Sequence, residues 1–257
     1  MAIIIISLLL LVSLVPHLTF SAHVGIVNGT EAKPHSRPYM VSLQKGFQHV
    51  CGGFLISEKF VLTAAHCRMG NEILTAVVGA HNLRNRSEKS VRMKVKSYHL
   101  HPDFTVKPWR NDVMLLKLVK KVQLNKNVKI ISMSKQERDI KPDSACAVAG
   151  WEKLSFKGKV STQLMEAGVK IMNNTECENK WKKIYLPSQM ICVYGHGGSC
   201  GGDSGGPLVC EDTAVGVTSF GDARVCNSRK RPEVYMKISE FLPWIDSIIG
   251  NKGRNLL

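Results

Sequence analysis

The chain has 257 residues, of which 44% are hydrophobic, a composition that is typical of a globular protein and does not suggest disorder. This length suits one large all-β domain or two smaller ones. Lysine and arginine outnumber aspartate and glutamate by 35 to 20, which gives a formal net charge of +15. Such a charge attracts polyanions. In a secreted protein we expect sulfated glycans or proteoglycans rather than nucleic acid, with plain solubility as the alternative.

The first segment, residues 1–21, is expected to be a secretory signal peptide. The run AIIIISLLLLVSLV is apolar and uncharged, and the small residues Ser21 and Ala22 follow it, although the usual positive n-region is missing. A membrane anchor is the alternative, but the run is short for a membrane span. No later segment is long and apolar enough to cross a bilayer, so we expect a secreted protein.

Short apolar runs separated by Gly, Pro, Asn or Asp predict many β-strands. In chain order they are YMVSLQ, FLISEKFVLTAA, LTAVVGAHNL, DVMLLKLV, CAVAGW, PLVC and AVGVTSFG. The segment 120–142 is polar and basic and could join two halves, each of a length that suits one small barrel. Near the end, EFLPWIDSIIG predicts a short amphipathic helix with Pro243 in its first turn, where a missing N–H matters little.

Eight cysteines in a secreted chain predict four disulfides. Their number permits 105 pairings and therefore gives no connectivity. A zinc site is the competing interpretation, but the chain has no CxxC pair and the expected compartment is oxidising. We expect no metal and no cofactor.

Three motifs carry side chains that suit nucleophilic catalysis. VLTAAHC contains His66, NDVMLLKL contains Asp112 just before an apolar strand, and GDSGGP contains Ser204. A serine hydroxyl is a poor nucleophile until a base takes its proton, and the base needs an anion to hold its tautomer. Each residue alone could be structural: a buried histidine, a turn-capping aspartate or a turn serine. Their combination in these contexts indicates a Ser-His-Asp triad.

The chain closely resembles the trypsin/chymotrypsin family of serine proteases. IVNG, CGGFLI, LTAAHC, DVMLLKL and GDSGGPLVC occur in the family's order, and the resemblance spans residues 26–250. It implies an all-β fold of two packed antiparallel six-stranded β-barrels, joined near 120–142, with a short C-terminal helix. The active site would lie between the barrels, and residues 251–257 would form a C-terminal tail.

The resemblance also implies roles for the residues of the site. Ser204 would be the nucleophile of a serine endopeptidase, His66 the general base and then acid, and Asp112 the group that orients the imidazole. The backbone N–H groups of Gly202 and Ser204 would form the oxyanion hole, where the tetrahedral intermediate carries its negative charge. Protein or peptide substrates and serpin-type inhibitors are the implied partners.

Members of this family are made as zymogens, and the new N-terminus pairs with the acid just before the serine. Here that pair would be Ile26 and Asp203, since an unpaired buried carboxylate is unfavourable. Gly25 precedes the cleavage site, so neither a trypsin-like activator nor a digestive protease is expected. A signal cut after Ser21 leaves AHVG, residues 22–25, as an activation propeptide that suits a dipeptidyl peptidase, whereas a cut one residue later leaves an odd number.

The propeptide and PHSRPYMVSLQ resemble granzymes, mast-cell proteases and cathepsin G-like enzymes, so we expect a secreted protease stored in granules. The family pattern implies four disulfides: Cys51–Cys67, Cys146–Cys210, Cys177–Cys192 and Cys200–Cys226. Many enzymes of the granzyme B and chymase type lack the last of these, and the chain departs from that subgroup there.

Five residues are expected around the primary specificity pocket. Gly198 stands where trypsin-like members carry the aspartate that binds Lys or Arg, and Ser199 lies next to it. Ser219, Phe220 and Gly221 match the strand that lines the pocket and pairs with the substrate backbone. Gly221 leaves the entrance open to a large side chain.

A sixth pocket residue, Glu233, stands where most members have glycine, just before VY of PEVYMK. A carboxylate there could meet a Lys or Arg side chain from the side and could leave room for Phe or Tyr. The predicted specificity is therefore mixed basic and aromatic. The alternative is that Glu233 points away or pairs with Arg229, Lys230 or Arg231.

Sequons at Asn85 and Asn173 predict glycosylation, whereas Asn28 is close to the inserted N-terminus and is not favoured. The basic clusters LRNRSEKSVRMKVK, KLVKK, KWKKIY and SRKR suggest a heparin-like partner, although each alone is more often a solvated face. A catalytically silent cationic protein on the same fold, heparin-binding or antimicrobial, is the rival hypothesis. Such relatives lose the histidine or the serine, and this chain keeps both.

Overall fold

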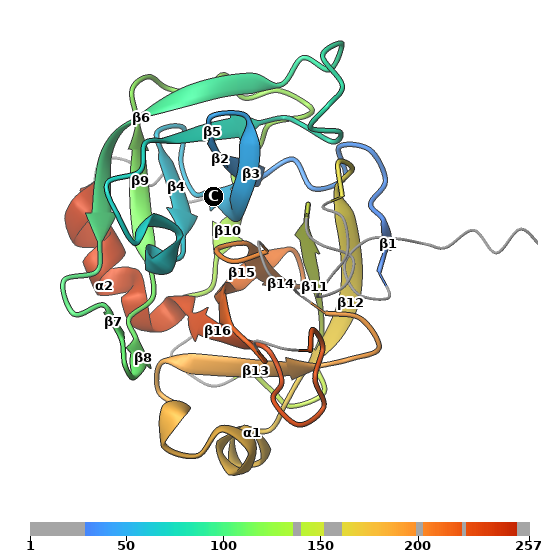
Figure 1. Cartoon of the computed structure of the whole chain (residues 1–257), viewed down its shortest axis with the longest axis vertical. Helices are drawn as coiled ribbons and strands as arrows, with labels where there is room; N and C mark the ends of the chain where they lie inside the picture. The colour runs from blue at the N-terminus through green and yellow to red at the C-terminus, as the bar shows by residue number, and fades with distance from the viewer. Residues whose placement is uncertain (1–28, 136–139, 152–160, 199–202, 223–224, 251–257) are drawn as a thin grey trace, which may run out of the picture.

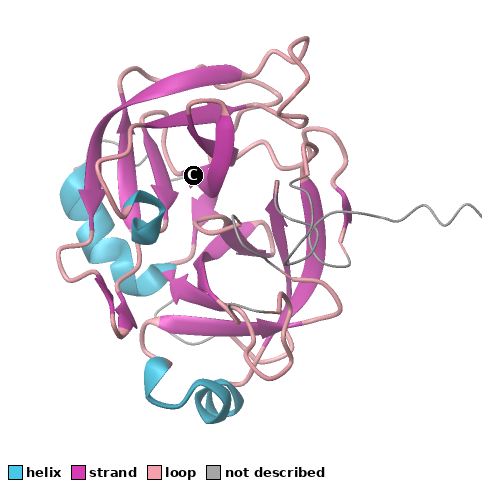
Figure 2. Cartoon of the chain, viewed as in Figure 1, coloured by secondary structure: helices cyan, strands magenta, loops and turns pink. Residues whose placement is uncertain are grey.

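The computed structural model describes the chain in five ranges: 29–135, 140–151, 161–198, 203–222 and 225–250. In the view of Figure 1 one group of strands lies above the other, and the last helix runs along one side. Figure 2 shows that strands make up most of the regular structure. None of the helices in the described ranges is long and apolar enough to span a membrane.

The first half of the chain forms a closed antiparallel barrel. Its strands, in the order in which they pair, are β2 (Met40–Lys45), β3 (Gln48–Leu55), β4 (Phe60–Thr63), β9 (Met114–Leu118), β6 (Val91–Leu100) and β5 (Leu74–Val78). In β6, Met93 is buried while Arg92 and Lys94 are exposed, the alternation expected for a strand with one face on a core. Leu43, Val61 and Met93 belong to the apolar cluster of this barrel.

The second half forms another ring of six antiparallel strands. In pairing order they are β12 (Met165–Ile171), β11 (Ala145–Gly150), β14 (Pro207–Cys210), β15 (Thr213–Phe220), β16 (Val234–Lys237) and β13 (Met190–Tyr194), and pairing of β13 with β12 closes the ring. Two short strands attach from outside, β1 (Thr30–Glu31) to β12 and β10 (Ser132–Met133) to β15. The expected pair of six-stranded barrels is therefore confirmed.

The C-terminal helix α2 (Ile238–Ile249) contributes to an apolar cluster that both barrels share. One buried cluster contains Phe54 of β3, Val217 of β15, and Phe241 and Ile245 of α2. Such a shared core restrains the relative orientation of the barrels because rearranging them would expose this surface. The placement of Pro243 in the first turn was wrong: the helix begins two residues earlier than predicted, at the buried Ile238, so the proline is its sixth residue and lies in the second turn.

Shorter elements surround the barrels. They are the 3-10 helices η1 (Ala65–Arg68) and η2 (Lys182–Ile184), the hairpin of β7 (Thr105–Val106) and β8 (Trp109–Arg110), and helix α1 (Asn174–Trp181). The sequence did not predict α1, whose apolar periodicity is weak. Asn173 caps this helix by accepting a hydrogen bond of 2.8 Å from the backbone N–H of Thr175.

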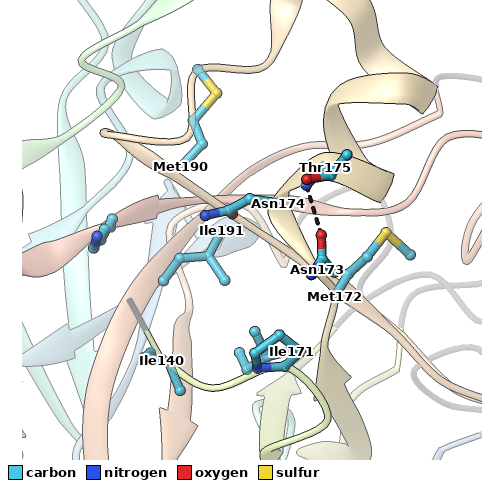
Figure 3. A pocket seen from close by; sticks show the side chains of 10 residues that line it. Ile140, Ile171, Met172, Asn173, Asn174, Thr175, Met190 and Ile191 are labelled. Atoms are coloured by element: carbon cyan, nitrogen blue, oxygen red, sulfur yellow. Dashed lines mark hydrogen bonds between the residues drawn. The ribbon is translucent and has the colours of Figure 1, made fainter. Parts of the chain in front are cut away.

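A cavity of about 200 Å³ lies where β12 and β13 meet the start of α1. Figure 3 shows Ile171, Met190 and Asn173 around it. None of its lining residues belongs to the triad or the specificity pocket expected from the sequence.

The predicted glycosylation residues Asn85 and Asn173 are both exposed.

The structure contains three disulfides that match implied pairs: Cys51–Cys67, Cys146–Cys210 and Cys177–Cys192. Cys226 is also disulfide-bonded, and its implied partner Cys200 lies outside the described residues. The expected signal peptide, the propeptide, Ile26, Asn28 and the C-terminal tail lie outside them as well.

Candidate active site

The pairing of β4 with β9 brings His66 and Asp112 together. Thr63, the last residue of β4, pairs with Met114, the first residue of β9. Because the strands are antiparallel, the chain after Thr63 and the chain before Met114 leave the barrel at the same end. There, Oδ1 of Asp112 accepts a hydrogen bond of 2.9 Å from the backbone N–H of His66, and Oδ2 lies 2.7 Å from its Nδ1.

The Asp112 carboxylate is wholly buried, with an exposed fraction of 0%. Ser219 of β15 donates a third hydrogen bond to it, of 2.5 Å to Oδ2. A buried carboxylate needs such partners because it has lost its water. The arrangement favours the imidazole tautomer with the proton on Nδ1, which leaves Nε2 of His66 able to accept a proton.

Ser204 reaches this site from the second half of the chain. Its carbonyl oxygen accepts a hydrogen bond of 2.9 Å from the backbone N–H of Gly52, and Cys67 Sγ lies 3.6 Å from the same oxygen. Cys67 follows His66 directly, so the contact places the Ser204 backbone beside the His66–Asp112 pair. The structure therefore gathers all three residues of the expected triad in one region.

The glycine after Ser204 permits this close approach. Gly205 has a φ of +83°, and a Cβ built on it would lie 2.1 Å from Thr63 Oγ1 and 2.6 Å from the carbonyl oxygen of Gly52. Only glycine combines this left-handed backbone with so little space. Gly202, expected in the oxyanion hole, lies outside the described residues.

Asp203 points its carboxyl group into the protein. The residue is 2% exposed, and a Cβ added to Gly150 would lie 1.8 Å from its Oδ1. The backbone N–H of Gly206 donates a hydrogen bond of 2.8 Å to the Asp203 carbonyl oxygen, which closes the turn around Ser204. Asp203 therefore carries a buried carboxyl group directly before Ser204.

Glu233 is buried between two of the expected pocket glycines. A Cβ on Gly198 would lie 3.3 Å from Glu233 Oε2, and a Cβ on Gly221 would lie 3.4 Å from its Cγ. The backbone N–H of Asn227 donates a hydrogen bond of 2.7 Å to Oε1. Desolvation raises the pKa of Glu233 to about 7. Ser199, expected beside Gly198, lies outside the described residues.

Among the described residues no ion pair joins Glu233 to the basic residues 229–231 that follow Asn227 in sequence. Those three side chains are exposed, whereas Glu233 is 6% exposed. The Glu233 carboxyl group therefore has no cationic partner from this segment and lies next to Gly198 and Gly221.

A Trypsin family model matches residues 26–245 of the chain. The chain belongs to the trypsin family of serine endopeptidases. It is 39% identical to Duodenase-1 of Bos taurus, over 96% of this chain and 98% of the relative. It is also 38% identical to Granzyme B(G,H) of Mus musculus, over 86% and 89%, and 37% identical to Cathepsin G of Homo sapiens, over 93% and 92%. These relatives agree with the expected group of granule-type proteases.

Among solved structures, neuropsin, a serine protease expressed in the limbic system of mouse brain, superposes on this protease with a TM-score of 0.81. The two chains share 30% sequence identity, and the match covers 87% of this chain and all of the other. The fold of the protease is thus that of a solved family member.

Three residues of the site were missed by the sequence analysis. Trp109 of β8 packs edge-on against His66, with ring centroids 5.4 Å apart, and Trp181 of α1 packs edge-on against Phe220 at 5.1 Å. Asn227 holds the Glu233 carboxylate. Trp109 stands three residues before Asp112, which was the available signal. Nothing local distinguishes Trp181 or Asn227, whose positions depend on loops packed against the second barrel.

Proposed function

We propose that Ser204, His66 and Asp112 form the catalytic triad of this serine endopeptidase. The observation that carries the proposal is the buried Asp112 carboxylate, which contacts His66 from within the first barrel and Ser219 from the second. A carboxylate held in this way orients the imidazole and stabilises its charged form. The Ser204 turn packs against the same corner of the first barrel through Gly52.

In the proposed reaction, Oγ of Ser204 attacks the carbonyl carbon of the scissile peptide bond while Nε2 of His66 takes the hydroxyl proton. The tetrahedral intermediate's oxyanion is bound by the backbone N–H groups of Gly202 and Ser204. His66 then gives its proton to the leaving amine, and the peptide bond breaks to leave an acyl-enzyme. Water, deprotonated by His66, hydrolyses that ester and regenerates Ser204.

The activation step that we propose pairs the α-amino group of Ile26 with Asp203 after removal of residues 22–25. The burial of Asp203 against Gly150 supports it, because a carboxylate in that place gains from a cation. Removal of AHVG as two dipeptides fits a dipeptidyl peptidase, and we propose that the enzyme is stored in secretory granules, in line with its similarity to Granzyme B(G,H) and Cathepsin G.

For the primary specificity we propose mixed basic and aromatic cleavage, with Glu233 as the residue that admits Lys or Arg. The support is its burial against Gly198 and Gly221, with one oxygen bound to Asn227 and the other facing Gly198. A substrate cation would provide the partner that this carboxylate lacks among the described residues. When the carboxyl group is protonated, the same space suits Phe or Tyr.

Further proposals concern partners and modification. The net charge of +15 supports binding to a sulfated glycosaminoglycan, and retention on heparin that persists to elevated salt is the expected result. The exposure of Asn85 and Asn173 supports glycosylation at both sequons. Serpin-type inhibitors are the proposed natural regulators of the mature enzyme.

The function is tested with the mature chain that begins at Ile26. A serine-reactive phosphonate should label Ser204, and peptides with Lys, Arg, Phe, Leu, Met or Asp before the scissile bond define the specificity. Ser204→Ala should abolish labelling and cleavage, whereas the matched variant Ser188→Ala, at an exposed serine, should keep both. Correctly processed protein without labelling or cleavage would instead support the catalytically silent cationic protein.

A further inference from the structure

A row of aromatic rings leads away from His66. The ring of Trp109 contacts the imidazole, stacks on Phe220 with centroids 6.0 Å apart and an interplanar angle of 19°, and Phe220 in turn meets Trp181. Trp109 and Phe220 are half-buried, so each presents part of its ring to solvent. We call Trp109, Phe220 and Trp181 the ring row. It connects the β7–β8 hairpin of the first barrel to β15 of the second.

Exposed cations border the far end of the ring row. Lys182 and Lys183 follow Trp181 directly in η2, and Arg229, Lys230 and Arg231 lie in the segment before β16. We call these five residues the cationic rim. They are all exposed, and five like charges in two neighbouring segments create a positive field over this part of the surface.

Specific contacts hold the two segments of the rim at Trp181. The guanidinium carbon of Arg231 lies 5.7 Å from the centre of the Trp181 ring, within the range of a cation–π contact. The indole N–H of Trp181 donates a hydrogen bond of 3.0 Å to the carbonyl oxygen of Pro232. Lys180 of α1 donates one of 2.8 Å to the carbonyl oxygen of Arg229. The rim is thus fastened to the ring row.

Hydrogen bonds also connect the β7–β8 hairpin to the backbone of the rim. Arg110 donates hydrogen bonds of 2.7 Å to the carbonyl oxygen of Ile184 and 3.2 Å to that of Lys183. In Figure 1 this hairpin extends from the first barrel to the level of β16. Of the nearby acids on α1, Glu176 pairs with Lys180 at 3.5 Å. All five rim residues are exposed, and Arg231 also contacts the Trp181 ring.

We propose that the ring row and the cationic rim together bind an acidic stretch of the substrate, on the N-terminal side of the scissile bond. This inference rests on the proposed function, in which Gly221 borders the pocket for the residue before that bond. Phe220 is the neighbour of Gly221, so a substrate that leaves the pocket along β15 meets the ring row next and the rim beyond it. Carboxylates complement the rim, and their aliphatic stems pack on the exposed parts of Trp109 and Phe220.

The size of the effect follows from the exposure of the rim. An exposed cation–carboxylate pair contributes only a few-fold in affinity and is screened by salt. Two or three such pairs on one substrate should give a preference of about fivefold in kcat/KM at low ionic strength. The preference should fall toward one as the salt concentration rises to about 0.5 M.

The test uses two peptides that share the residue before the scissile bond and everything after it. The third to fifth positions before the bond are Glu in one peptide and Gln in the other. The wild-type enzyme should prefer the acidic peptide about fivefold, and the double variants Lys182→Gln/Lys183→Gln and Arg229→Gln/Lys230→Gln should each lower that ratio. The control Lys94→Gln/Lys96→Gln, at exposed positions of β6 in the first barrel, should leave it unchanged.

Cleavage of the neutral peptide distinguishes a failure of the rim proposal from a failure of the proposed function. Cleavage of the neutral peptide with an acidic-to-neutral ratio near one would overturn the rim proposal while the proposed function stands. Absence of cleavage of both peptides would overturn the proposed function. In that case, fluorescence anisotropy of the labelled acidic peptide with Ser204→Ala still decides whether the rim binds it. Rim-dependent binding of a heparin oligosaccharide without any preference for the acidic peptide would assign the rim to a glycan and overturn the proposal.

Discussion

Ser219 donates a hydrogen bond of 2.5 Å to Oδ2 of Asp112, the oxygen that also lies 2.7 Å from Nδ1 of His66. Asp112 stands just before β9 of the first barrel, and Ser219 lies on β15 of the second. The carboxylate is therefore held from both barrels at once. Because it is wholly buried, it depends on these donors in place of water.

We expect Asp112→Asn to lower kcat by about 10⁴-fold, the magnitude typical of a serine triad that has lost its aspartate. The amide favours the wrong imidazole tautomer, which lowers kcat. Because the amide keeps the shape of the side chain, the melting temperature should change by only a few degrees. Steady-state kinetics and thermal unfolding of the same preparations measure the two effects. A kcat within tenfold of the wild type would contradict the assigned role of Asp112.

Gly205→Ala should lower the free energy of unfolding by more than about 3 kcal/mol, because backbone strain and a steric clash act together. The new Cβ would meet Thr63 and the carbonyl oxygen of Gly52 at a φ of +83°. Gly46→Ala is the matched control: its φ is +61°, but nothing lies within 4 Å of the added Cβ. It should lose about 1 kcal/mol. Equal losses in denaturant unfolding would show that the packing around the Ser204 turn is not decisive.

Glu233 should make the specificity depend on pH. Burial raises its pKa to about 7, so the carboxyl group is neutral at pH 5.5 and ionised at pH 8.5. The ratio of kcat/KM for a Lys peptide to that for a Phe peptide should rise about tenfold between these values, equivalent to about 1.4 kcal/mol. Any effect of pH on the chemical step that the two peptides share cancels in the ratio.

The matched variant for that experiment is Glu233→Gln, which keeps the shape and removes the charge. Its Lys-to-Phe ratio should be low and independent of pH. If the wild-type ratio stays constant from pH 5.5 to 8.5, or if the variant keeps the wild-type Lys preference, Glu233 does not set the basic specificity.

His49 should make the fold less stable in acid. Burial lowers its pKa to about 4 from the ordinary value of 6.5, and its Nδ1 lies 2.8 Å from the Ser42 hydroxyl. Between these values the unfolded chain binds more protons than the folded one, so the free energy of unfolding falls as the pH falls from 6.5 to 4, by up to about 3 kcal/mol. Urea unfolding at pH 7, 5.5 and 4.5 measures this slope.

The comparison for His49 uses two variants. His49→Gln should lose that part of the pH slope, whereas His196→Gln, at an exposed histidine, should keep it. Identical slopes in the wild type and His49→Gln would show that other groups cause the acid sensitivity.

Much of the fold follows from local patterns in the sequence. The apolar runs of β9 and β15 predicted strands, whereas β6 was not among the predicted strands because its basic residues hide the alternation of buried and exposed positions. The predicted end of α2 agrees with the structure to within one residue, but the helix begins two residues earlier than predicted. Its first residue, Ile238, packs in the apolar cluster that the barrels share. Helix α1 was missed because its stability comes from the Asn173 cap and the buried Trp181 rather than from apolar periodicity.

The sequence by itself determined the family and the identities of His66, Asp112 and Ser204 as candidates, because those residues stand in motifs whose chemistry depends on the immediate neighbours. Only the tertiary structure decided what lies around them. The contact of Trp109 with His66, the meeting of Trp181 and Phe220, and the burial of Glu233 beside Gly198 join segments that are distant in the chain. Such contacts depend on how two barrels and their loops pack, and no local pattern of residues encodes that packing.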